Sequence, residues 1–397
     1  MMWERVKLAD VSDSCLGKML DQRKNKGIYK PYLANVNVRW GAFDLDNLQE
    51  MKFEDDEDER YGIKYGDLII CEGGEPGRCA IWKEQLPNMK IQKALHRLRV
   101  NEEMDYRYVY YWFLLAGKQG ALKQYYTGAT IMHMPGQKLK EVVIDKPPLD
   151  VQRKIGDYLE AFDDLIENNQ KQIKLLEEAA QRLYKEWFVD LRFPGYEDVE
   201  IVDGVPEGWT EDTIDSKIDL LSGYAFKSAE FNGEGTYKIV TIKNVKDGQF
   251  DGDNVSRMVD IPKKMPEHCK LSDGDILLSL TGNVGRVCIV HGDNYLLNQR
   301  VAKIKSDNPT YAYCLFRSKD MFDKMNNLAN GAAQQNLSPI RTGKIKVVFP
   351  TDKLISAFEG IVSPMIQEIT LLNKTVLLLS QACDRLLPKL MNGEIEV

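Results

Sequence analysis

Two stretches of the chain carry apolar residues at alternating steps of four and three. The first runs from Ile155 to Trp187, and the second runs from Phe358 to Leu390, offset by 203 positions (155 to 358). Such spacing places the apolar side chains on one stripe of a helix, which is typical of a coiled-coil seam. Because an isolated helix does not keep a long apolar stripe in water, we expect two long helices that pack on each other.

The seam positions are the expected helix–helix contacts. They are Ile155, Leu159, Phe162, Ile166, Asn169, Ile173, Leu176 and Leu183 in the first helix, and Val362, Ile369, Leu372, Val376, Leu379 and Leu386 in the second. A polar seam residue such as Asn169 commonly fixes the register of a coiled coil at a cost in stability. We expect Pro364 to kink the second helix or to restart it, with Ser363 as the N-cap.

The chain ahead of each helical stretch has a different pattern, in which short apolar runs alternate with Gly, Asn and Asp. Leu68-Ile69-Ile70-Cys71 and Ile276-Leu277-Leu278-Ser279 are β-like runs, and residues 106–122 predict a helix rich in aromatic side chains. The fold class expected from these patterns is α+β. It comprises compact α/β domains at 1–147 and 209–349, long helices at 148–192 and 350–397, and a linker at 193–208 that is rich in Pro and Gly.

The two halves of the chain repeat each other. Gly66-Asp67-Leu68-Ile69-Ile70 returns as Gly274-Asp275-Ile276-Leu277-Leu278, and Gly74-Glu75-Pro76-Gly77-Arg78 returns as Gly282-Asn283-Val284-Gly285-Arg286. We also match Asn35-Val36 with Asn244-Val245. A period of this length indicates a duplicated domain and not a solenoid. If the two helices run antiparallel, the duplication gives the chain an approximate internal two-fold axis.

Composition adds limits on compartment and partners. Hydrophobic residues make up 43% and charged residues 28% of the chain, and seven cysteines are scattered without a Cys-x-x-Cys pair. No apolar run is long enough to span a membrane and no signal peptide is visible, so we expect a cytoplasmic protein with reduced thiols. The net charge of −7 argues against a simple nucleic-acid binder, although the acidic run Glu54 to Glu59, which we interpret as a solvated loop, contributes strongly to it.

Motifs for catalysis are missing. The chain has no Walker loop and no His-Glu-x-x-His, and Lys146-Pro147-Pro148-Leu149 is a poor match to the loop with which adenine methyltransferases hold a flipped base. The glycines of residues 73–78 could suggest a phosphate cradle, but the segment lacks a lysine and a clear following helix. A turn between two strands is the favoured interpretation. We therefore expect no catalytic residue, no cofactor and no metal.

Polar and basic residues near the repeated motifs are the candidate binding residues, because their side chains offer hydrogen-bond donors and acceptors to a ligand. In the first copy they are Arg78, Lys93, His96, Arg97, Tyr126, Thr127, Thr130 and His133. In the second copy they are Arg286, Asn298, Gln299, Arg300, Lys303, Asn330, Gln334, Gln335 and Asn336. The alternatives are plain connecting loops, a strand with a solvated basic face and, for the two motif arginines, structural salt bridges.

The order of these pieces resembles the specificity subunit of type I restriction–modification enzymes over nearly the whole chain. The matching pieces are Gly-Asp-Leu-Ile-Ile with Gly-x-x-Gly-Arg in both copies, Pro147-Pro148-Leu149-x-x-Gln152 before the first helix, Leu183-Tyr184-x-x-Trp187-Phe188 at its end, and Pro206-Glu207-Gly208-Trp209 after the linker. The second copy departs from this pattern, since Pro350-Thr351-Asp352 lacks the double proline and Leu390-Met391 replaces the Trp-Phe pair.

The resemblance implies two target-recognition domains that each read one half of a split, asymmetric site in double-stranded DNA. The candidate binding residues are then the expected DNA contacts, because Arg and Lys bond guanine edges while Asn and Gln bond adenine edges. It implies helices that act as spacer and dock two adenine-N6 methyltransferase subunits, with motor-nuclease restriction subunits joining them. Trp187 and Phe188 are the candidate partner contacts, with core packing as the alternative. Two competing hypotheses are a coiled-coil scaffold that binds only proteins and an enzyme with an unrecognised site.

Overall fold

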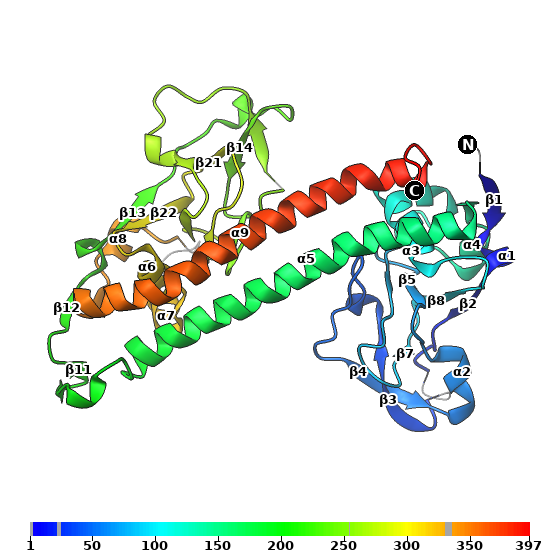
Figure 1. Ribbon diagram of the computed structural model, residues 1–397, viewed down its shortest axis with the longest axis horizontal. Coiled ribbons are helices and arrows are strands. Elements are labelled where there is room, and N and C mark those ends of the chain that lie inside the picture. The colour runs from blue at the N-terminus through cyan, green and yellow to red at the C-terminus, as the bar shows by residue number, and fades with distance from the viewer. Residues whose placement is uncertain (1–2, 22–24, 254, 330–335) are drawn as a thin grey trace. The chain divides into compact units, whose positions relative to one another are not determined.

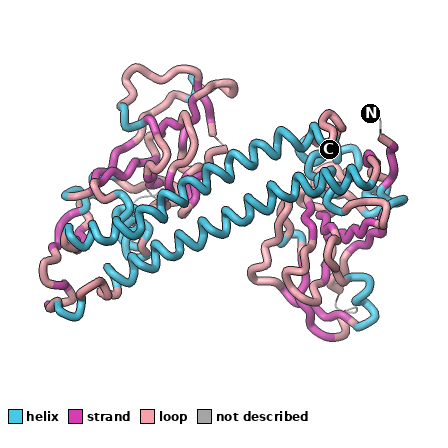
Figure 2. The backbone as a smooth tube through the Cα atoms, viewed as in Figure 1, coloured by secondary structure: helices cyan, strands magenta, loops and turns pink. Residues whose placement is uncertain are grey.

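The computed structural model describes residues 3–21, 25–253, 255–329 and 336–397. It contains two long helices, α5 (Leu149–Tyr184), which continues as the π-helical turn η4 (Lys185–Val189), and α9 (Asp352–Met391) (Figure 1). The chain forms two compact units, unit 1 from residues 1–165 and 379–397 and unit 2 from residues 166–378. Each unit holds one mixed domain, in which the strands are gathered, and one end of both long helices (Figure 2).

Domain 1 is the part of unit 1 ahead of α5. Its four-stranded antiparallel sheet has the order β2-β8-β5-β6, a smaller sheet has the order β4-β3-β7, and β1 pairs with β9. The strands are β1 (Glu4–Lys7), β2 (Ser12–Leu16), β3 (Ile28–Leu33), β4 (Gln49–Phe53), β5 (Leu68–Cys71), β6 (Cys79–Ile81), β7 (Lys90–Ile91), β8 (Leu95–Val100) and β9 (Val143–Lys146). The helices are α1 (Leu8–Val11), η1 (Asn35–Asn37), η2 (Asp55–Glu57), α2 (Asp58–Tyr61), α3 (Tyr106–Lys118), η3 (Ala121–Tyr125) and α4 (Gly136–Lys140).

Domain 2 lies in unit 2 between α5 and α9. Its four-stranded sheets have the orders β13-β22-β19-β20 and β17-β14-β21-β18, and β12 pairs with β23. The strands from the linker onward are β10 (Ile201–Val202), β11 (Val205–Pro206), β12 (Thr210–Thr213), β13 (Ile218–Ser222), β14 (Tyr237–Val240), β15 (Val245–Lys246), β16 (Gln249–Phe250), β17 (Ser256–Met258), β18 (Lys270–Leu271), β19 (Ile276–Ser279), β20 (Val287–Ile289), β21 (Tyr295–Leu297), β22 (Val301–Ser306) and β23 (Lys346–Phe349). The helices are η5 (Tyr196–Asp198), η6 (Ile214–Ser216), η7 (Ser228–Glu230), η8 (Glu267–Cys269), α6 (Pro309–Arg317), α7 (Lys319–Ala329) and α8 (Pro339–Gly343).

The apolar run of β5 explains why the four-stranded sheet of domain 1 has a core on each face. Leu68 and Ile70 point into the core that also contains α3, whereas Ile69 and Cys71 point into the core on the other face of the sheet. A strand covered on both faces has no polar alternation, which is why these residues form a continuous apolar run. Strand β19 repeats this arrangement in domain 2.

The expected duplication is confirmed by the sheet order. Strands β2, β8, β5 and β6 correspond one by one to β13, β22, β19 and β20, with antiparallel pairing in both sheets. The glycine motif of residues 73–78 is the expected turn between antiparallel strands, here β5 and β6. The predicted aromatic helix also exists, as α3, but it ends at Lys118 because the chain turns at Gly120, which has a φ of +70°.

One of the sequence matches between the copies is shifted by two residues. In domain 2 the side chain of Asn244 accepts from the N–H of Thr241 (2.8 Å) and donates to the carbonyl of Asp251 (2.9 Å). The residue that makes the same bonds in domain 1 is Asn37, with Ala34 (2.9 Å) and Asp44 (3.0 Å). The matching of Asn35 with Asn244 is therefore wrong, because an Asn-Val pair occurs twice in this segment.

The long helices run antiparallel within each unit. In unit 1 the start of α5, at Ile155 and Leu159, shares a core with Cys383 and Leu387 near the end of α9. In unit 2 the end of α5 meets the start of α9, and the Trp187 and Phe358 rings lie 5.9 Å apart. All the predicted seam residues are buried or half-buried, including Asn169.

The prediction that the second helix restarts at Pro364 is wrong. Helix α9 is a single helix that includes this proline. A proline removes one backbone hydrogen bond and crowds the carbonyl four residues earlier, here that of Gly360. Both residues are exposed, so water can satisfy the freed carbonyl and the helix continues.

The acidic run is not a loop, although Glu54, Asp55, Asp56 and Glu59 are exposed as expected. It forms the short helices η2 and α2, and its acids meet lysines that are themselves largely buried. Glu57 pairs with Lys18, which is 3% exposed at its side chain, and Asp58 pairs with Lys30 (2.8 Å) and Lys90 (3.1 Å). The hydrogen bond from Lys30 holds the pKa of Asp58 below its usual value. The run therefore neutralises cations that the domain buries.

Two further findings bear on the expected compartment. Within the described ranges, no helix has the length and apolar character needed to cross a membrane. All seven cysteines are free, and six of them are buried.

Candidate nucleic-acid interface

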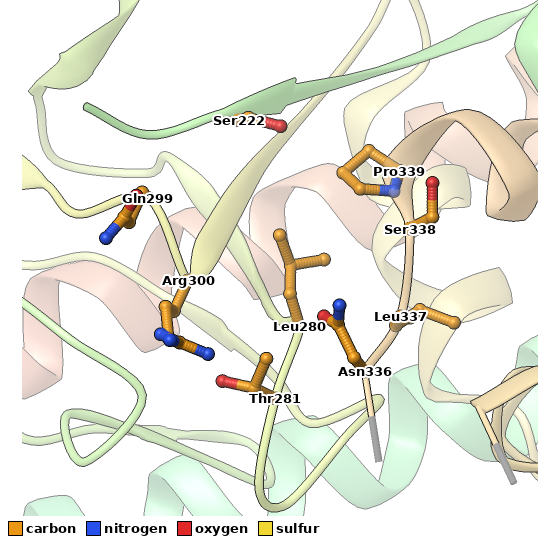
Figure 3. A pocket seen from close by; sticks show the side chains of 9 residues that line it. All are labelled: Ser222, Leu280, Thr281, Gln299, Arg300, Asn336, Leu337, Ser338 and Pro339. Carbon is orange, nitrogen blue, oxygen red and sulfur yellow. The ribbon is translucent and has the colours of Figure 1, made fainter. Parts of the chain in front are cut away.

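A surface cavity in domain 2 gathers polar side chains from segments far apart in the sequence. It has a volume of about 340 Å³ and lies where β13 and β19 end, beside the β21–β22 loop and the chain that leads into α8. Figure 3 shows the side chains around it: Ser222, Leu280, Thr281, Gln299, Arg300, Asn336, Leu337, Ser338 and Pro339. Side chains that offer amide, hydroxyl and guanidinium groups are those that bond base edges and phosphates.

Backbone hydrogen bonds fix this cavity. The N–H of Leu280 donates to the carbonyl of Arg300 (3.0 Å), and the N–H of Leu337 donates to the carbonyl of Leu280 (2.7 Å). Thr281 and Asn336 form an isolated antiparallel bridge beside them. The side chains of Thr281, Arg300 and Asn336 are thereby placed next to one another by backbone contacts that do not depend on which side chains are present.

Domain 1 has the same set of backbone contacts, and we call this shared set the frame. The N–H of Glu72 donates to the carbonyl of Ala94 (3.0 Å), and the N–H of Met134 donates to the carbonyl of Glu72 (2.7 Å). Gly73 and His133 form the isolated bridge. These contacts pair Glu72 with Leu280, Gly73 with Thr281, Ala94 with Arg300 and His133 with Asn336. The two domains thus present different side chains on one frame.

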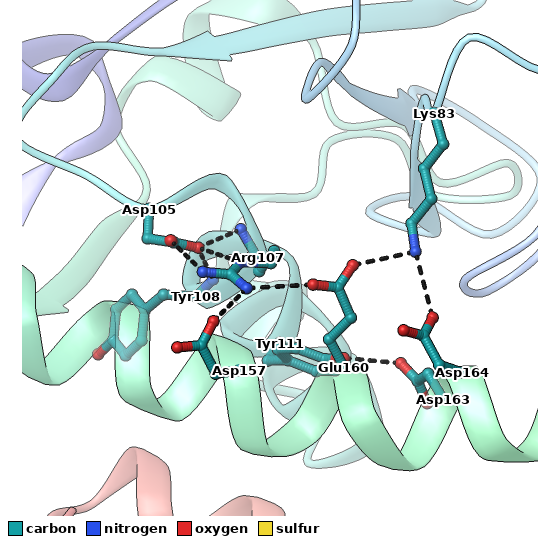
Figure 4. Close-up of polar contacts among 9 residues, drawn as sticks. All are labelled: Lys83, Asp105, Arg107, Tyr108, Tyr111, Asp157, Glu160, Asp163 and Asp164. Carbon is teal, nitrogen blue, oxygen red and sulfur yellow. Dashed lines mark hydrogen bonds and ion pairs between the residues drawn. The ribbon is translucent and has the colours of Figure 1, made fainter.

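A network of ion pairs holds domain 1 on the first part of α5 within unit 1 (Figure 4). Arg107 at the start of α3 contacts Asp105 (2.8 Å), Asp157 (2.5 Å) and Glu160 (3.1 Å). These carboxylates raise the pKa of the Arg107 guanidinium, with Asp105 contributing most. The other links run from Lys83 to Glu160 (3.0 Å) and Asp164 (3.7 Å), and from the Tyr111 hydroxyl to Asp163 (2.7 Å).

Comparison with known families decides what kind of protein this is. The family model described as "Type I restriction modification DNA specificity domain" matches the chain twice, at residues 2–178 and 206–358. These matches cover most of the sequence and follow its two repeats.

The chain belongs to this family.

Individual relatives agree with the assignment. The chain is 27% identical over 351 residues to the type I restriction enzyme MjaIX specificity subunit of Methanocaldococcus jannaschii, covering 84% of this chain and 78% of that protein. It is 29% identical to the MjaVIII specificity subunit of the same organism over 70% of this chain and 63% of that protein. The crystal structure of the type I restriction–modification S subunit from M. genitalium is similar with a TM-score of 0.61 and 17% identity, covering 98% and 96% of the two chains, and shows the same fold.

Three of the predicted DNA contacts of this family member line the domain 2 cavity. They are Gln299, Arg300 and Asn336, all exposed. The structure shows no hydrogen bond or ion pair from the side chain of any of them among the described residues, so their side-chain donors and acceptors are free for a ligand. Asn298 is half-buried beside them, and its side chain accepts from the N–H of Arg300 (3.4 Å).

Two predicted contacts in domain 1 are buried instead. Arg97 pairs with Asp13 (2.8 Å) and donates to the carbonyl oxygens of Glu59 (2.9 Å) and Arg60 (3.0 Å). His96 is 1% exposed with its Nε2 3.1 Å from the carbonyl oxygen of Met134, and burial lowers its pKa. These side chains cannot reach DNA in this structure, so we leave them out of the interface.

The two motif arginines differ. Arg78 pairs with Glu75 (3.2 Å) and donates to the carbonyl of Asn35 (3.2 Å), which is the structural alternative. Arg286 is half-buried, and no hydrogen bond or ion pair is found for its guanidinium among the described residues. Lys303 pairs with Asp275 (2.7 Å), the residue directly ahead of β19, so its contact is structural as well.

The remaining candidates of domain 1 surround its frame. Thr127 and His133 exchange backbone hydrogen bonds (2.8 and 2.9 Å), and both are exposed, as is Thr130. Tyr126 is half-buried and donates its hydroxyl to the carbonyl of Pro76 (2.6 Å). Lys93 is half-buried on the frame. Asn330, Gln334 and Gln335 lie outside the described residues.

The candidate partner contacts lie in the core of unit 2. Trp187 is 6% exposed, and the Phe188 ring lies 5.1 Å from that of Phe358 and 5.2 Å from that of Tyr311. Their aromatic faces are occupied by the domain and by α9. The core-packing alternative accounts for both residues, and we do not assign them to a partner surface.

Sequence reasoning missed the frame residues that lie between the two repeated motifs. In each copy they begin two residues after the end of the first motif. Glu72 and Gly73 come after Cys71 in the first copy, and Leu280 and Thr281 come after Ser279 in the second. The sequence contained a signal for them. Both flanking motifs are repeated in the two halves of the chain, but the residues between them differ, as expected for positions that read different targets.

Proposed function

We propose that this chain is the sequence-reading, non-catalytic subunit of a cytoplasmic type I restriction–modification complex. Domain 1 reads one half and domain 2 the other half of a split, asymmetric DNA site, while the helices space the halves and dock two methyltransferase subunits. Motor-nuclease subunits complete the complex. The observation that carries the proposal is the duplicated frame, which presents different polar side chains in each domain of a DNA specificity protein.

The available chemistry suits base reading. Arg300 offers a guanidinium, which pairs with the O6 and N7 acceptors of guanine, and Gln299 and Asn336 offer amides of the kind that pair with adenine. Lys93 and His133 are the corresponding groups in domain 1. Arg286, whose guanidinium has no partner among the described residues, is suited to a phosphate because such contacts position the duplex without reading it.

The test is to express the chain with its methyltransferase subunits and to map methylated adenines across a genome. We expect one split motif, and replacing domain 1 with that of a related chain should change one half of the motif only. A motif without two separable halves would contradict the proposal. Arg300→Ala should relax base preference at one position, whereas Arg286→Ala should weaken binding to all sequences alike and reduce its salt dependence.

The net charge of −7 favours a second candidate, a scaffold that binds proteins and not DNA. The two functions differ in their response to salt. A DNA reader loses affinity steeply as salt rises, because phosphate contacts release counterions. The assembled complex should therefore bind its motif less tightly at 200 mM than at 50 mM salt. Absence of any DNA binding by the complex would favour the scaffold.

A further inference from the structure

Two frame positions of domain 1 depend on each other. A Cβ atom at Gly73 would lie 2.9 Å from Nδ1 and 3.1 Å from Cε1 of the His133 ring, so the imidazole occupies the space of a side chain at residue 73. In domain 2 the equivalent pair is Thr281 with Asn336, which are bridged in the same way. Domain 1 fills this space with a glycine and a large imidazole, whereas domain 2 fills it with two side chains of medium size, those of Thr281 and Asn336.

Other equivalent positions also carry different chemistry. Ala94 occupies the place of Arg300, and Lys93 precedes it as Gln299 precedes Arg300. A Cβ at Gly74 would meet Asn35 at 2.9 Å, and a Cβ at Gly282 would meet Ile242 at 3.2 Å. The backbone hydrogen bonds of the frame are shared, while charge, size and hydrogen-bonding capacity are not.

Both frames also contain a buried polar atom without a partner among the described residues. In domain 1 it is Oδ1 of Asn35, whose amide nitrogen donates to the carbonyl of Gly73 (3.0 Å). In domain 2 it is the hydroxyl of Thr281. Buried polar atoms are nearly always hydrogen-bonded in folded proteins, so the unpaired hydroxyl of Thr281, which lines the polar cavity, points to a ligand that completes it.

We propose that residues 73, 93, 94 and 133 of domain 1, and Thr281, Gln299, Arg300 and Asn336 of domain 2, determine which bases each domain reads. Positions 73 and 133 act as a coupled pair. Because the frame is common, exchanging the side chains carries base preference from one domain to the other. The half-site of domain 2 contains a guanine read by Arg300, a contact that Ala94 cannot make in domain 1. This inference rests on the proposed function and assigns its specificity to particular residues.

The experiment uses the full chain in complex with its methyltransferase subunits. The variant Gly73→Thr, Lys93→Gln, Ala94→Arg, His133→Asn gives domain 1 the side chains of domain 2. We expect methylation mapping to show that the half-site of domain 1 shifts toward that of domain 2, with at least about a tenfold change in preference at one or more positions. The other half-site and the gap should not change. As a matched control, Lys123→Gln removes an exposed lysine of the same domain away from the frame and should leave both half-sites intact.

The coupling is tested separately. Gly73→Thr alone should lower methylation and thermal stability because its side chain meets the His133 ring, and adding His133→Asn should restore both. If Gly73→Thr and the double variant Gly73→Thr, His133→Asn lower methylation and thermal stability equally, positions 73 and 133 are not coupled.

The reverse set, Thr281→Gly, Gln299→Lys, Arg300→Ala and Asn336→His, makes the reciprocal prediction for domain 2. The single change Arg300→Ala only removes atoms from an exposed side chain, so it should fold. It therefore tests the inference even if the two four-residue variants fail to fold. Loss of one guanine preference in one half-site supports the inference, and an unchanged motif overturns it. A wild-type complex that reads no split motif would contradict the proposed function itself, whereas a split motif that these folded variants leave unchanged contradicts only the assignment of residues.

Discussion

At the scale of single residues, burial decides what a charged side chain does. Arg97 lies on β8 of domain 1 and Arg300 directly precedes the equivalent strand β22 of domain 2, yet Arg97 is 4% exposed with carbonyl and carboxylate partners while Arg300 is exposed beside a cavity. A buried guanidinium needs such partners, because an unpaired buried charge is costly. The sequence shows only that both residues are arginine.

Asp163 provides a residue-scale prediction about pH. Burial raises the pKa of this carboxyl, although the Tyr111 hydroxyl donates to it (2.7 Å). An acid whose folded pKa is raised binds a proton more tightly in the folded state, so its contribution to stability is present at low pH and is lost as pH rises through the folded pKa. Asp163→Asn keeps an acceptor for Tyr111 without the charge.

We expect Asp163→Asn to raise the thermal unfolding temperature of the full chain at pH 7.5 and to have less effect at pH 4. Thermal scans of wild type and variant at both pH values measure this. Asp164→Asn is the control, since Asp164 is the neighbouring acid, is exposed, and lies 3.7 Å from Lys83, which also acts on the charge of Asp163. A larger gain at pH 4 than at pH 7.5 would show that the burial argument has the wrong sign.

At the scale of elements, apolar periodicity predicted the helices well and their interruptions poorly. The heptad pattern follows from the geometry of one helix and needs no knowledge of its surroundings. The effect of Pro364 depends on whether water can reach the carbonyl it releases, which is a property of the folded surface. Likewise, the acidic run becomes η2 and α2 because lysines from distant strands approach it.

Pro364→Ala gives the prediction at this scale. The change restores one backbone hydrogen bond in a continuous helix and should stabilise the chain by about 1–3 kcal/mol. Denaturant unfolding of the full chain, followed by circular dichroism, measures the difference. Ser356→Ala, another exposed position of α9, is the control and should change stability by about 0.5 kcal/mol or less. A destabilised Pro364→Ala chain would mean that α9 requires the proline.

At the scale of the whole molecule, the proposed function makes the long helices a spacer. We expect seven-residue insertions between residues 165 and 166 and between residues 378 and 379 to lengthen the gap between half-sites by about three base pairs. Seven residues keep the seam in phase and add roughly 10 Å at 1.5 Å each, against 3.4 Å per base pair. These points are chosen because they fall between the compact units.

Methylation mapping measures the gap, and the bases within each half-site should stay the same. Inserting two glycines after Gly204 is the control, since it lengthens a surface turn of the linker without lengthening a helix. An unchanged gap in a folded insertion variant would contradict the spacer role.

The sequence by itself determined the duplication, the two long helices, the strand–turn–strand motifs and the family. These features follow from local spacing and from order along the chain, which do not depend on distant contacts. Tertiary structure alone decided which residues form the frame. Glu72, Ala94 and His133 are far apart in sequence and come together only through backbone hydrogen bonds between segments. It also decided that His96, Arg97 and Trp187 are interior, because burial depends on what packs against a side chain from elsewhere in the fold.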